Sequence, residues 1–157
     1  MAARVSIQAR DFNVADEIAA LRQGDLRVGA VCCFVGTVRD RSEGASVSSM
    51  ELEHYPGMTE KAIEAMIDEA HNRFDLYGVR VIHRIGLLKP ADQIVLVVVT
   101  SAHRAESFRA CEFLMDYLKT QAPFWKKEQT PEGARWVDAR VSDDAALAKW
   151  GIAKPNT

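Results

Sequence analysis

The order of helical and extended patterns predicts an α+β domain with a mixed or antiparallel sheet. Strand-like and helix-like segments follow one another as β-α-β-β-α-β-β-α-β-α, which is neither strict βαβ alternation nor an all-β pattern. The length of 157 residues suits one domain with one sizeable core. We therefore expect a single domain over residues 1–150, followed by a short C-terminal tail over residues 151–157.

Hydrophobic periodicity assigns the elements of the first half of the chain. Val5–Ala9 alternates like a short strand, and Asn13 is placed to cap a helix that Gly24 would end. Residues 28–39 form a long segment rich in β-forming residues. Because this segment is almost continuously apolar, we expect it to be buried on both faces. An alternating strand is expected over residues 47–55.

The second half repeats the alternation of strands and helices. Thr59 is placed to open a helix with a regular apolar face, and Pro123 stops a later helix. The patterns predict helices and strands over residues 59–74, 79–85, 93–100, 104–120, 135–141 and 143–150. The segment just after Pro123 is expected to be a loop.

Composition and charge exclude several classes of protein. The net charge of -2 argues against a general nucleic-acid binder, which usually has a basic excess. The longest strongly apolar run, Ile94–Val99, is far too short to span a bilayer. Residues 1–12 lack the apolar core of a signal peptide. We therefore expect a cytoplasmic protein that binds neither nucleic acid nor membranes.

The three cysteines do not indicate disulfide or metal chemistry. Cys32 and Cys33 are neighbours in an extended segment, where successive side chains point to opposite faces, so they cannot easily share one metal ion. Cys111 lies among apolar residues of the helix over 104–120. We expect all three to be small buried hydrophobic residues.

The histidines do not indicate a metal site either. No HxH or HxxxH pair exists, so we expect no metal ion, and nothing in the chain suggests a cofactor. His54 and His83 lie on alternating strands, where packing or hydrogen bonding is the expected role. His71 is expected to be an exposed helix residue.

The segment Lys119–Glu128 carries the strongest functional signal. Lys119 and Lys126 stand on either side of Pro123, beside the large aromatic residues Phe124 and Trp125. In an unbroken helix the two lysines would be about 10 Å apart, but the proline lets the following segment fold back. A lysine in partly dry surroundings near other cations holds its proton less tightly, and can act as a nucleophile or as a general acid and base.

A second cluster lies at the start of the same helix. His103 and Arg104 occupy the end where free backbone N–H groups favour anions. Together with Lys119, they suggest an anionic-ligand pocket that contains a working lysine. The residues alone leave three other interpretations open: solvated surface lysines, a Schiff-base lysine enzyme acting on a phosphorylated carbonyl compound, and a module that senses a phosphate ligand or binds a partner.

Five blocks of sequence resemble the large, catalytic subunit of molybdopterin synthase, the MoaE family. They are long and keep the same order, and the resemblance extends over nearly the whole chain except its last few residues. The blocks are Leu52–Ala62, Val81–Gly86, Thr100–Arg104, Met115–Glu128 and Thr130–Trp136. The resemblance implies an α/β hammerhead fold, a homodimer and a small ubiquitin-like partner, whose C-terminal Gly-Gly carries a thiocarboxylate. The resulting heterotetramer would transfer sulfur to cyclic pyranopterin monophosphate, forming the dithiolene of molybdopterin in molybdenum cofactor biosynthesis.

The resemblance also implies roles for individual residues. Lys119 would be the principal catalytic residue and Lys126 would assist it. The substrate would be bound by Thr37, Val38, Arg39, His103, Arg104, Lys119, Lys126, Lys127 and Glu128. Arg140 would match an arginine that the family contributes across the dimer.

Overall fold

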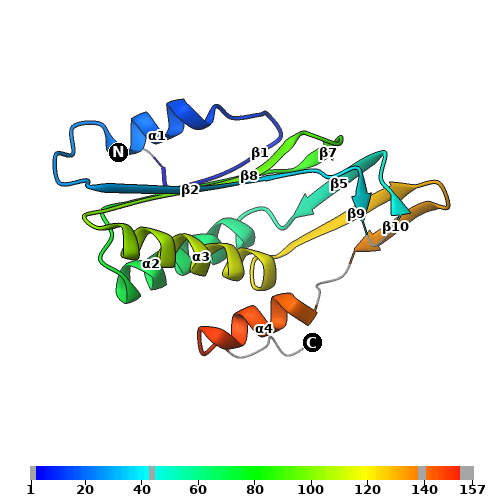
Figure 1. Ribbon diagram of the computed structural model, residues 1–157. Coiled ribbons are helices and arrows are strands. Elements are labelled where there is room, and N and C mark those ends of the chain that lie inside the picture. Colours follow the sequence, from blue (N-terminus) through cyan, green and yellow to red (C-terminus); the bar gives the residue numbers. More distant parts are fainter. Residues whose placement is uncertain (1–2, 43–44, 138–140, 153–157) are drawn as a thin grey trace.

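The computed structural model describes residues 3–42, 45–137 and 141–152, and it contains two four-stranded sheets (Figure 1). The first sheet has the order β1-β6-β8-β2. Its strands are β1 (Val5–Gln8), β6 (Gly78–Arg84), β8 (Gln93–Ser101) and β2 (Ala30–Thr37). β1 runs parallel to β6 and the other pairs are antiparallel, so the expected α+β fold with a mixed sheet is confirmed.

The second sheet is antiparallel and has the order β10-β9-β5-β7. Its strands are β10 (Gly133–Val137), β9 (Phe124–Thr130), β5 (Ser49–His54) and β7 (Gly86–Leu88). Two short strands, β3 (Arg41–Ser42) and β4 (Ala45–Ser46), pair with each other. The prediction of a loop after Pro123 was wrong. β9 begins there, because β5 and β10 form hydrogen bonds with it on both sides.

Among the described residues, three helices cover the first sheet and a fourth packs on one of them (Figure 1). α1 (Val14–Arg22) covers one face, whereas α2 (Met58–Arg73) and α3 (Arg104–Thr120) cover the other, and α4 (Val141–Lys149) packs against α3. The cap predicted at Asn13 is confirmed, since its side chain accepts a hydrogen bond of 3.0 Å from the backbone N–H of Asp16. Among the described residues, no helix is both long and apolar enough to cross a membrane.

β8, and not β2, is the strand that is buried on both faces. Its alternate residues enter two cores: Val95, Val97 and Val99 face α2 and α3, whereas Leu96 and Val98 pack with the residues beneath α1. β2 lies at the edge of the sheet, so the expectation that residues 28–39 are buried on both faces was wrong. An apolar run does not distinguish a central strand from an edge strand.

The edge position of β2 also corrects the expectation for the cysteines. Cys111 is buried on α3, as expected, and burial raises the pKa of its thiol. Cys32 is only half-buried, and Cys33 is exposed. In the described residues β2 is the last strand of the first sheet, and α1 packs mainly on β6 and β8, which leaves the opposite face of β2 less covered. Cys33 is therefore not a core residue in the single chain.

A buried threonine ties the second sheet to helices α2 and α3. Thr59, in the first turn of α2, has no exposed surface. Its hydroxyl accepts a hydrogen bond from the backbone N–H of Tyr55 and donates one to the carbonyl oxygen of Pro123, each at 3.0 Å. The start of α2 thus holds the end of β5 and the turn between α3 and β9 in a fixed relation.

Candidate functional site

The break at Pro123 places Lys119 and Lys126 near one imidazole ring. Lys119 lies in the last turn of α3 and Lys126 in β9. Burial of His83, together with the charges of Lys119, His54 and Lys126, lowers the pKa of His83 to about 4. Both lysines therefore act electrostatically on the same ring. The chain folds back as the sequence indicated, although through a strand and not through a loop.

The turn between the two lysines is held at two points. The Thr59 hydroxyl binds the carbonyl of Pro123, and the ring of Phe124 stacks on His83 with 3.9 Å between centroids and 18° between planes. Phe124 also lies opposite His54 in the β5–β9 register. The packing roles expected for His54 and His83 are confirmed: the side chain of His54 is 15% exposed, and its Nε2 lies 3.5 Å from Glu60 Oε1.

Alternation along β9 separates the residues expected to bind substrate. Phe124, Lys126 and Glu128 share one face of the strand, whereas Trp125 and Lys127 share the other. Glu128 is buried, with 3% of its surface exposed. The side chain of Lys127 thus points away from that of Lys126, and the two cannot line one face of a pocket together.

An ion pair lies further along the Lys126 face of β9. Arg135 Nη2 on β10 lies 4.0 Å from Glu128 Oε2, and the two residues are opposite each other in the β9–β10 register. The Glu128 carboxylate therefore faces a cation on the neighbouring strand. On the other face of β9, Trp125 makes an edge contact with Tyr55, with 4.8 Å between ring centroids.

Thr37, Val38 and Arg39 lie at the same end of the first sheet as Lys119. Thr37 pairs with Gln93 at the start of β8, and α3 runs back along β8 and β2 toward that end. Val38 is buried, and its backbone N–H donates to the carbonyl of Asp92 at 2.9 Å. Thr37 and Arg39 are exposed, so their side chains are available to a ligand.

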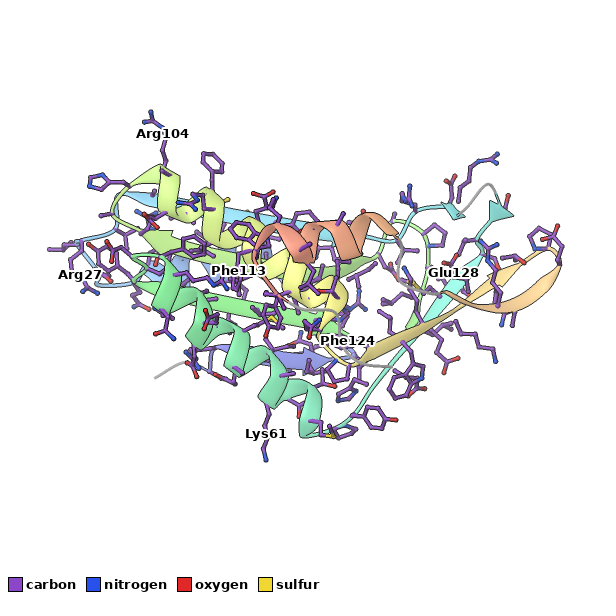
Figure 2. The ribbon with its side chains drawn as sticks, turned by 90° about the horizontal axis from the view of Figure 1, so that it is seen from below. Arg27, Lys61, Arg104, Phe113, Phe124 and Glu128 are labelled. Carbon is purple, nitrogen blue, oxygen red and sulfur yellow. The ribbon has the colours of Figure 1, made fainter. Side chains whose placement is uncertain are left out.

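His103 and Arg104 lie at the opposite end of α3. His103 is the N-cap of the helix and makes no side-chain capping hydrogen bond, and both residues are exposed. At 1.5 Å per residue, His103 and Lys119 are separated by about 24 Å along the helix axis. Arg104 points outward from the end of the molecule, far from Phe124 and Glu128 (Figure 2). Within one chain, therefore, Arg104 cannot act on Lys119 as the sequence had suggested.

The expected site residues thus form two groups in a single chain. Lys119, which was expected to lie in partly dry surroundings, is exposed, and Lys126 is half-buried. Arg140 lies outside the described residues. In the described parts of the chain, no cluster of His, Cys, Asp or Glu could hold a metal ion. His71 is exposed on α2, as expected.

A protein-family model described as "MoaE protein" matches residues 7–121. The chain belongs to the MoaE family. It is 62% identical over 152 residues to the molybdopterin synthase catalytic subunit of Ralstonia nicotianae, covering 97% of this chain and 86% of that protein. Members of this family are catalytic subunits of molybdopterin synthase, so the chain is an enzyme subunit of molybdenum cofactor biosynthesis.

Solved structures agree with this membership. The molybdopterin biosynthesis MoaE protein of Burkholderia ambifaria is 56% identical, with a TM-score of 0.83 over 97% of this chain and all of that one. A Helicobacter pylori structure is a complex of subunits 1 and 2 of molybdopterin-converting factor. Its matching chain is 19% identical, with a TM-score of 0.71 over 88% of this chain and 92% of that one. At that identity the likeness shows the fold alone.

Sequence reasoning missed the part that His83 and Thr59 play beside the MoaE lysines. The sequence pattern predicts only packing or hydrogen bonding for His83 and only a helix start for Thr59. Both contact the turn at Pro123 and Phe124, which is distant from them in sequence. One feature of the sequence could have indicated these roles: both residues are polar at positions where an apolar residue would pack equally well. Thr59 is completely buried, and His83 shares a strand face with buried valines.

The lowered pKa of His83 predicts a pH-dependent stability. The ordinary value of 6.5 applies to the unfolded chain and about 4 to the folded one, so the unfolded chain binds more protons between these values. The neutral ring of His83 therefore contributes to the free energy of unfolding. This contribution is complete above pH 6.5 and is lost as the pH falls from 6.5 through about 4, at a cost on the order of 1–3 kcal/mol. Urea unfolding at a series of pH values measures it.

His83→Asn is the comparison for this measurement. Its amide can still donate to the carbonyl of Arg84, but it does not titrate. The free energy of unfolding of the wild type should fall relative to that of the variant as the pH decreases across this window. A difference that stays constant would contradict the pKa.

Proposed function

We propose that this chain, acting in the cytoplasm, transfers sulfur from the C-terminal thiocarboxylate of a small ubiquitin-like subunit to cyclic pyranopterin monophosphate. Lys119 is the principal catalytic residue in this proposal, and Lys126 assists it. The observation that carries the proposal is the place of the two lysines in a MoaE-family chain, on either side of a turn that Thr59 and His83 hold through Pro123 and Phe124. The relatives are named as the catalytic subunit of molybdopterin synthase, a name that implies a second, separate subunit.

The chemistry requires charge and a mobile proton at one place. Each transfer forms a bond from sulfur to a pterin carbon and breaks the bond from sulfur to the carbonyl carbon of the small subunit. The pterin carbon loses its bond to oxygen in exchange, and that oxygen leaves as water or stays on the phosphate. Water supplies the oxygen that leaves a carboxylate on the spent subunit. Lys119 and Lys126 provide amines that can move protons or attack an acyl carbon, and Arg39 provides a guanidinium that can bind a phosphate in a fork.

The sulfur comes from the partner in this proposal. Cys111 is buried on α3 and Cys32 is half-buried on β2, in the core that the helices share with the first sheet. Cys33 is exposed, but it belongs to an edge strand and not to the turn that joins the two lysines. A glycine tail without side chains can reach a narrow site at little steric cost.

A second copy of the chain completes the site in this proposal. Phosphate binding by His103 and Arg104 requires them to come within contact distance of substrate held by Lys119, and α3 keeps them about 24 Å apart in one chain. In a symmetric dimer, the start of one α3 can lie beside the end of the other. The same arrangement would remove Lys119 from bulk water.

The outer edge of β2 supports this dimer. In the parts of the chain that the structure describes, no strand pairs with that edge. Val31 and Phe34 on β2 are 37% and 40% exposed, and Phe108 on α3, which packs against β2, is 63% exposed. An apolar edge strand of eight residues invites pairing with another strand. Antiparallel pairing across a two-fold axis brings His103 of one copy toward Arg39 of the other.

Replacing Lys119 tests the catalytic assignment. Lys119→Ala should abolish dithiolene formation from the thiocarboxylated small subunit and the cyclic pterin, and Lys126→Ala should slow it less. Because Lys119 is an exposed side chain at a helix end, its loss should cost no more than about 1 kcal/mol of stability. Lys61→Ala, at an exposed lysine of α2 (Figure 2), is the matched control. Activity of Lys119→Ala within about threefold of wild type would refute the assignment.

Hybrid dimers test the shared site. Chains carrying Lys119→Ala are combined with chains carrying Arg104→Ala, and the mixed dimers are purified through two different tags. Each hybrid holds one site with both mutations and one intact site, so it should regain about half of the wild-type activity, while each parent dimer stays nearly inactive. An inactive hybrid, formed from parents that are themselves dimers, would show that the site is not shared.

A further inference from the structure

His83 is a polar residue at the end of an apolar row. It lies on β6, on the face that also carries Val79 and Val81, which are buried against α2 and α3. Its neighbours in register are Ile7 on β1 and Val95 on β8. An apolar side chain would satisfy this packing, so the choice of an imidazole needs a reason beyond the core.

The hydrogen bond at Nδ1 fixes which edge of the ring carries the proton. His83 Nδ1 lies 2.9 Å from the carbonyl oxygen of Arg84. A carbonyl oxygen can only accept, so Nδ1–H is the donor. Because burial and the neighbouring cations lower the pKa of His83 to about 4, the ring is neutral at neutral pH. Nε2, at the opposite edge, therefore holds a lone pair and can only accept.

Cationic and titratable groups from three elements face this ring. They are Lys119 from α3, Lys126 from β9 and His54 from β5, and His54 in turn lies beside Glu60 of α2. Among the neighbouring charges that lower the pKa of His83, that of Lys119 has the largest effect. His83 is half-buried, and an acceptor in such a position is stabilised when a donor replaces water. The Lys119 ammonium is a charged donor close enough to oppose protonation of the ring.

We propose that His83 is a positioning residue for Lys119: its ring holds Phe124 by stacking, and its Nε2 accepts a hydrogen bond from the Lys119 amine during turnover. This inference rests on the proposed function of Lys119. The Nζ of Lys119 lies at the end of four rotatable bonds and can occupy many positions. A hydrogen bond to one fixed acceptor would restrict it to one of them. His83 does not itself touch the substrate.

Three replacements separate the functions of the ring. His83→Phe keeps a flat ring for Phe124 but has no acceptor. His83→Gln places an amide near the position of Nε2, and His83→Asn places one near Nδ1. Loss of the acceptor should lower kcat of His83→Phe by about tenfold to a hundredfold, with KM for the cyclic pterin within about threefold of wild type. His83→Gln should recover part of kcat, and His83→Asn should not.

The alternative role, pure packing, gives a different result. If the ring served only to stack on Phe124, His83→Phe would match the wild type in kcat, and that result would overturn the inference. If His83→Phe does not fold, the glutamine and asparagine variants decide. Equal kcat values for those two variants would also overturn it.

A spectroscopic readout keeps the inference separate from the proposed function. ¹⁵N NMR of the wild type should show the neutral Nδ1–H form of His83, and Lys119→Ala should shift the Nε2 resonance while the control Lys61→Ala leaves it in place. An unchanged Nε2 resonance in Lys119→Ala would overturn the inference. If the wild-type protein made no dithiolene, the proposed function would fail. If the wild type were active, Lys119→Ala inactive and His83→Phe fully active, only the role of His83 would be rejected.

Discussion

The forced change of direction at Pro123 is the constraint on which the site depends. Proline cannot continue the hydrogen-bond ladder of α3, and the residue before it is biased away from helical geometry. Without this break, Lys119 and Lys126 would lie along one exposed helix face. The break alone would leave a mobile segment, so the structure holds it from both sides. Thr59 binds the Pro123 carbonyl, and His83 stacks on Phe124.

This turn also decides the electrostatics. It gathers two lysines around a histidine that burial keeps neutral, which avoids a third positive charge at the same point. The buried carboxylate of Glu128 lies on the same face of β9 as Lys126 and near Arg135, so negative charge is present within the second sheet. An anionic substrate would therefore meet fixed cations at one end of α3, with the anion-favouring helix start at the other end.

Local signals in the sequence predicted local structure well. The bounds of α3 and the Asn13 cap followed from apolar spacing and from a side chain that can bind free N–H groups. The α+β class followed from the order of helical and extended patterns, and the family and the enzyme class followed from motifs that remain in order along the chain. β9 was not predicted because most side chains of Phe124–Thr130 are polar, so the segment lacks the apolar alternation of a strand. It forms a strand because it pairs with β5 and β10.

Features that depend on distant segments were not predictable in this way. β2 and β8 are both apolar, but only their order in the sheet makes one an edge and the other a centre. The helix predicted over residues 104–120 is long enough to hold Arg104 and Lys119 far apart, so the prediction of one pocket for both was wrong within a single chain. The contact of His83 with Phe124 joins two strands of different sheets, and no spacing within either strand indicates it.

The central claim is that the two ends of α3 form one site only between two copies. A cross-link measures this directly. Chains with Arg104→Cys and ¹⁵N labelling are mixed with unlabelled Lys119→Cys chains, both in a Cys33→Ser background, and treated with a bismaleimide too short to span α3. Mass spectrometry should then find a labelled peptide joined to an unlabelled one. Dimers that form normally but yield no cross-link between the two peptides would contradict the claim.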